Sequence, residues 1–117
     1  MKILKTLSSL LLVFSFFSFA PLHHGWADYD QENPIEFTGT IKELAYENPH
    51  ALIKINQEEK IWTVYLAPIS RMQARGVTEE MVKKGAVIKV LGYPHKKTKD
   101  EMRAERIFVK DQKYELR

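Results

Sequence analysis

The chain of 117 residues contains no cysteine, and this absence excludes disulfides, thiolate metal sites and a lipid anchor attached through cysteine. Any metal site must therefore use histidine, carboxylate or backbone ligands. Acidic residues are missing before Asp28, whereas Lys2 and Lys5 lie in that segment. Without residues 1–20, 16 basic side chains face 15 acidic ones, a net charge of +1. Such a balance gives little electrostatic reason to bind nucleic acid, so we expect no such partner.

Long apolar runs are also scarce, and the main one lies at the N-terminus. It extends from Leu7 to Phe19, is interrupted only by serines, follows two lysines and ends at the small residue Ala20. This order is typical of a secretory signal peptide, and the run is shorter than the roughly 20 residues of a membrane-spanning helix. We predict a signal peptide over residues 1–20 and a periplasmic or secreted protein. Ala20 and Ala27 are alternative cleavage points, and membrane contact is expected only through an uncleaved signal segment.

The remaining chain is long enough for one domain. Residues 21–34 mix Pro, Gly, Asn and acids and predict an irregular arm, residues 35–110 predict the folded domain, and residues 111–117 form a charged tail. Alternation of apolar and polar residues predicts strands, and a phase change near Glu43 predicts a bulge. The predicted strands are 35–46, 51–55, 60–66, 86–93 and 101–109. Between the third and fourth strands, residues 69–84 change to helical periodicity and end at Gly85.

This order predicts a mainly β fold: a small five-stranded antiparallel barrel of the oligonucleotide/oligosaccharide-binding (OB) type, with a short helical insert between strands 3 and 4. An open α+β sheet is the alternative. In an OB barrel, ligands bind between the loop joining strands 1 and 2 and the loop joining strands 4 and 5. Here those loops are 47–50 and 94–100, and each contains a histidine.

All four histidines lie beside turn-forming residues: His23, His24, His50 and His95. His50 and His95 should project from the same end of the barrel, and the arm could bring the other two to it. Neutral imidazoles in an exported, thiol-free protein suit copper or zinc, with copper favoured by the affinity order of divalent ions. Solvated loop histidines are the alternative, because no pair has the tight spacing of a metal motif.

Aromatic and basic residues give a second set of candidates. Trp26, Trp62 and Tyr93 could form a stacking face for a ligand, and Arg71 could hold an anion at the start of a helix. Core packing is the more common use of such aromatics, and an ion pair is the more common use of such an arginine.

Catalytic motifs are not recognisable, because Ser70 lacks the context of a nucleophile and the paired carboxylates lie in a turn and at a helix start. We therefore expect a non-enzymatic binding protein, with copper or zinc as the candidate cofactor. The alternative is a structural or adaptor module that binds a periplasmic protein, a peptide or a glycan on the barrel face.

Several short motifs occur in one order along the chain: HHGW at 23–26, GTI at 39–41, NPHA at 48–51, LAPISR at 66–71, GYP at 92–94 and MRAERI at 102–107. In this the chain resembles a family of small exported bacterial proteins of unknown function. The resemblance covers almost all of the chain after the signal segment. It implies export and a compact β-rich fold, and it implies no particular activity.

Overall fold

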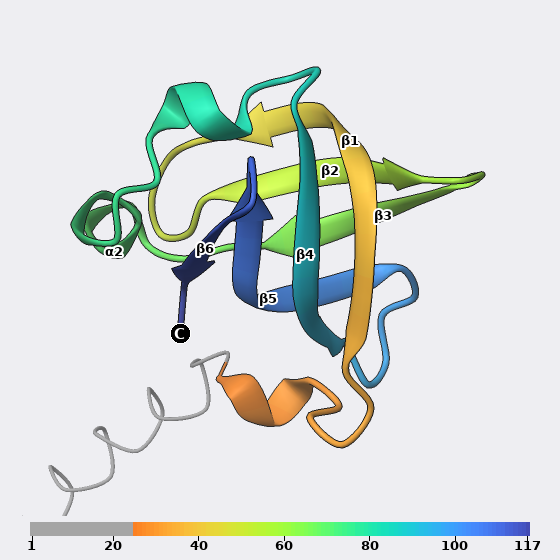
Figure 1. Cartoon of the computed structure of the whole chain (residues 1–117). Helices are drawn as coiled ribbons and strands as arrows, with labels where there is room; N and C mark the ends of the chain where they lie inside the picture. The colour runs from red at the N-terminus through yellow and green to blue at the C-terminus, as the bar shows by residue number, and fades with distance from the viewer. Residues whose placement is uncertain (1–24) are drawn as a thin grey trace, which may run out of the picture.

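Strand β1 (Ile35–Ala45) starts the barrel (Figure 1). Its alternating residues Phe37, Gly39 and Ile41 are buried and face the core. The computed structural model describes residues 25–117. The pairing of β1 with β2 (Leu52–Gln57) shifts register between Ile41 and Glu43. The bulge predicted near Glu43 is therefore confirmed.

The strands close into the predicted five-stranded barrel. β2 and β3 (Lys60–Tyr65) continue β1 as an antiparallel meander, and β4 (Val87–Pro94) pairs with the other side of β1. β5 (Glu101–Val109) pairs with β4 and also with β3, which closes the barrel. The closing pair is parallel and makes the barrel a mixed one. The reason is that successive strands alternate in direction, so the third and the fifth run the same way.

The insert between β3 and β4 is helical, as predicted. It consists of α2 (Ile69–Ala74) and a 3₁₀ helix (Glu79–Val82). Gly76 and Gly85 follow these turns with positive φ angles of 87° and 96°, which glycine adopts at little cost. The insert buries Met72 and Val82 completely, so it adds to the core that the strands enclose.

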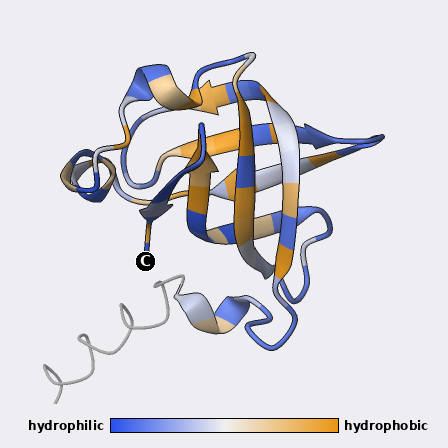
Figure 2. Cartoon of the chain, in the orientation of Figure 1, coloured by the Kyte–Doolittle hydropathy of each residue, from blue (hydrophilic) through white to orange (hydrophobic). Residues whose placement is uncertain are grey.

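Apolar side chains from every strand of the barrel and from the insert fill its interior, and Figure 2 shows the corresponding hydrophobic stretches along the ribbons. Two strand glycines allow close contact between neighbouring backbones. A methyl group at Gly39 would overlap the carbonyl oxygen of Asn56, and one at Gly92 would overlap the carbonyl oxygen of Arg103. Both glycines therefore set how tightly the strands can coil around the core.

The two ends of the described chain differ, because the C-terminal residues pair with a strand of the barrel and the N-terminal arm is largely irregular. Within the charged tail at 111–117, Gln112–Glu115 form strand β6 beside β5, and Leu116 is buried. The described part of the arm, residues 25–34, is largely irregular, with one 3₁₀ turn at Trp26–Asp28. Within residues 25–117, no helix has both the length and the apolar character that crossing a membrane requires.

Candidate functional site

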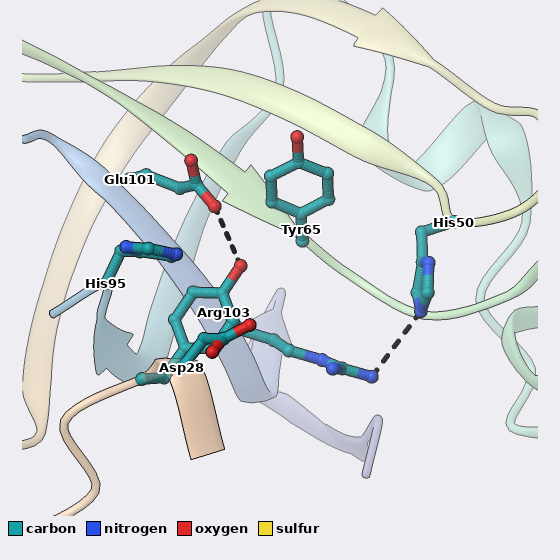
Figure 3. A pocket seen from close by; sticks show the side chains of 7 residues that line it. Asp28, His50, Tyr65, His95, Glu101 and Arg103 are labelled. Atoms are coloured by element: carbon teal, nitrogen blue, oxygen red, sulfur yellow. Dashed lines mark hydrogen bonds between the residues drawn. The ribbon is translucent and has the colours of Figure 1, made fainter. Parts of the chain in front are cut away.

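A pocket of about 290 Å³ lies where the N-terminal arm meets the loop between β1 and β2 and the loop between β4 and β5 (Figure 3). This is the end of the barrel at which the OB topology predicts a ligand. Both described histidines line the pocket, as predicted. The lining residues are Asp28, Tyr29, His50, Tyr65, His95, Glu101 and Arg103.

Arg103 on β5 is the most unusual residue of the pocket, because its side chain is charged and yet only 9% exposed. Its Nη2 lies 3.4 Å from Nε2 of His50. Its Nε has no hydrogen-bond partner within the described chain, and no carboxylate of residues 29–117 forms an ion pair with it. Burial lowers the pKa of Arg103, an effect that Tyr29 opposes and the charges of Arg71 and Arg117 increase. An arginine nevertheless stays protonated at neutral pH, so the pocket wall carries a buried cation.

His50 stands beside this cation as a neutral imidazole. Burial lowers the pKa of His50, and the charges of Arg103 and Arg71 lower it further. A guanidinium can only donate, so Nε2 of His50 is the accepting nitrogen and Nδ1 carries the proton.

His95 forms hydrogen bonds within its own loop. Its Nδ1 accepts hydrogen bonds from the backbone N–H groups of Lys97 and Thr98, at 3.0 and 2.9 Å. An accepting nitrogen carries no proton, so the proton of the neutral ring lies on Nε2. In this state His95 offers the pocket a hydrogen-bond donor rather than a metal-binding lone pair.

Tyr29 of the arm contacts two other residues of the pocket, Glu101 and His95. Its hydroxyl donates to Oε2 of Glu101 at 2.8 Å, and its ring contacts His95 edge-on with 5.0 Å between centroids. Burial raises the pKa of Tyr29, and Glu101 raises it further, so the hydroxyl stays protonated. The arm is thereby fixed as one wall of the pocket.

Trp26 and Tyr93 lie behind the pocket, outside its lining, and support Arg103. The guanidinium groups of Arg103 and Arg117 each lie 4.2 Å from the ring centre of Trp26, and Tyr93 contacts that ring edge-on at 5.9 Å. We call Arg103, Trp26 and Arg117 the arginine–tryptophan cluster. The hydroxyl of Tyr93 donates to Glu105 at 3.2 Å.

The other two candidates for a ligand face lie elsewhere. Trp62 is 7% exposed and stacks on Phe37 in the core, so core packing describes it and a ligand face does not. Arg71 lies on α2, where its Nη1 donates to the carbonyl of Leu116 at 3.3 Å. It makes no ion pair within residues 25–117, and its charge acts on His50.

The predicted metal site is only partly covered by the structure. His23 and His24 lie outside the described residues. Within residues 25–117, no three His, Asp or Glu side chains are close enough together to hold a metal ion. A four-histidine site therefore stays a prediction.

Sequence reasoning missed Arg103, Tyr29 and Glu101 as pocket residues. Two of them come from the start of β5, and the MRAERI motif that supported the family resemblance contains Arg103. That motif was the available signal, but it did not indicate a pocket.

Comparison with known proteins adds a family but no activity. No curated protein matches the chain. One family model does match, over residues 11–103, which reach from the N-terminal segment to Arg103 of the pocket. The chain therefore belongs to the family described as "Family of unknown function (DUF6152)".

Proposed function

We propose that this protein is an exported, non-enzymatic binding protein whose pocket takes a small organic anion. The observation that carries the proposal is Arg103, a buried guanidinium in the pocket wall that forms no ion pair with any carboxylate of residues 29–117 and whose Nε has no partner in the described chain. A buried charge without a counter-ion lowers stability. An incoming carboxylate would supply that counter-ion and match the planar fork of the guanidinium.

The surroundings of Arg103 support an anion rather than a cation. Arg71 and Arg117 add positive charge near it, and burial, Arg103 and Arg71 lower the pKa of His50 and so favour its neutral form. The proton on Nε2 of His95 provides one further donor. A metal cation at His50 would stand next to the guanidinium and be repelled by it.

The test is calorimetric titration of the exported protein with acetate, butanoate and phosphate. We expect one organic anion to bind at a single site and the variant Arg103→Met to lose it. Arg106→Met is the matched control, because Arg106 lies on the same strand but pairs with Glu115 and does not line the pocket. Equal binding by the wild type and Arg103→Met would overturn the proposal, as would absence of binding by the wild type.

Capture of copper or zinc is the second candidate, and the observation in its favour is that His50 and His95 line one pocket together with Asp28 and Glu101. Such a site would need a ligand from His23 or His24. Native mass spectrometry with copper(II) tests it: a sub-micromolar site should vanish in the double variant His50→Ala, His95→Ala. Affinity that survives this double change would refute the histidine site.

A further inference from the structure

Besides Arg103, the pocket carries two carboxylates, those of Asp28 and Glu101. Glu101 lies two residues before Arg103 on β5, so these two side chains leave the same face of the strand from Cα atoms about 7 Å apart. Figure 3 shows their functional groups pointing in different directions, the guanidinium toward His50 and the carboxylate toward the hydroxyl of Tyr29, to which it is hydrogen-bonded. The pocket therefore has a basic end and an acidic end.

The acidic end has unused binding capacity. Oε2 of Glu101 accepts one hydrogen bond, from Tyr29, whereas a carboxylate has about four acceptor positions. No Lys, Arg or His of residues 25–117 forms an ion pair with this carboxylate. Within residues 29–117, Arg103 and Glu101 thus form no ion pair, either with each other or with another side chain.

Aromatic rings lie between the two ends. Tyr29 and Tyr65 both line the pocket, and Figure 3 shows Tyr65 between Glu101 and His50. A carboxylate beside aromatic faces is a favourable environment for an ammonium group, which gains both a charged hydrogen bond and cation–π attraction.

We propose that the ligand is a small zwitterion, an amino carboxylate whose carboxylate binds Arg103 and whose ammonium group binds Glu101. The proposal rests on the anion-binding function and specifies its substrate class. The cavity of about 290 Å³ suits a molecule of this size. Since the two side chains leave β5 from Cα atoms about 7 Å apart and do not pair with each other, a linear ω-amino acid fits the spacing better than an α-amino acid, whose two charges are adjacent.

The experiment compares 6-aminohexanoate, glycine and hexanoate by calorimetric titration. We expect 6-aminohexanoate to bind at least about tenfold more tightly than hexanoate or glycine, the range of one charged hydrogen bond. Glu101→Gln should remove this advantage over hexanoate, because a neutral amide cannot pair with the ammonium group, whereas it can still accept from Tyr29. Glu105→Gln is the control, since Glu105 lies on the same strand but does not line the pocket.

The outcomes separate the two proposals. Equal affinity for 6-aminohexanoate and hexanoate, or an equal loss of both in Glu101→Gln, would refute the zwitterion and leave the anion site intact. Tighter binding of glycine would refute the inferred spacing of the charges. Absence of binding by any carboxylate would refute the anion site itself.

Discussion

Replacing Arg103 by methionine should remove binding and yet make the protein slightly more stable. A buried unpaired charge costs several kcal/mol, and an unsatisfied buried N–H costs about 1–3 kcal/mol. Arg103 carries both penalties, because it is 9% exposed and its Nε has no partner in the described chain. Two contacts of Arg103 offset part of these penalties. Stacking on Trp26 contributes about 2 kcal/mol when desolvated, and the contact with His50, at 3.4 Å, is long for a hydrogen bond and contributes little.

Methionine reaches about as far as Nε of the arginine and contacts an aromatic ring favourably, so part of the stacking energy remains. We expect the free energy of unfolding of Arg103→Met to rise by about 1 kcal/mol, or Tm by roughly 4–8 °C for a domain of this size. Urea denaturation followed by tryptophan fluorescence measures this change, with Arg106→Met as the control. A loss of stability of about 2 kcal/mol or more would show that Arg103 holds the fold together, and the reasoning from its unpaired charge would be wrong.

Four further predictions concern the residues around the pocket. The folded pKa of His50 lies below its unfolded value of about 6.5, so the free energy of unfolding should fall as the pH drops below that value, by at most about 1.4 kcal/mol per pH unit. Denaturation at several pH values measures this dependence, and His50→Asn should lack it. Trp26→Ala removes two cation–π contacts and should lower the free energy of unfolding by about 2 kcal/mol, and an unchanged Tm would contradict the role of the arginine–tryptophan cluster. Gly92→Ala should cost about 1–3 kcal/mol through overlap with a neighbouring carbonyl, whereas Gly25→Ala, with open space around it, should change stability little in the same assay. If the protein is exported, the intact mass of the mature form should show cleavage before Trp26, because cleavage after Ala27 would remove a ring that contacts two arginines.

Most of the barrel could be predicted because its signals are local. Alternating burial along β1, the bulge near Glu43 and the glycines that end the helical turns all leave a pattern in neighbouring residues. The placement of His50 and His95 in one pocket followed from the topology, since an OB barrel brings those two loops to the same end.

Arg103 could not be predicted as a buried pocket residue. It stands between Met102 and Ala104, and strict alternation would place it on the outer, solvated face of β5. Its burial comes from Trp26 and Tyr29 of the arm, about 75 residues away in the sequence. The alternation of residues along β5 gives no sign of such a distant contact. β6 escaped prediction for a related reason: it is only four residues long and is surrounded by charged side chains.

The parallel pairing of β3 with β5, here called the seam, closes the barrel, so a ligand that binds across it should stabilise the closed barrel. In this seam Tyr65 of β3 lies opposite Arg103 of β5, so the pocket is built across the joint between the two strands. A ligand that touches both sides binds only the closed barrel and stabilises it by mass action, by about 2.7 kcal/mol at a concentration of 100 Kd. The amide of Thr63, which donates to the carbonyl of Asp100 at 2.9 Å beside the seam, should then exchange its hydrogen more slowly. A bound ligand would thus hold β3 and β5 together at the strand pair that closes the barrel.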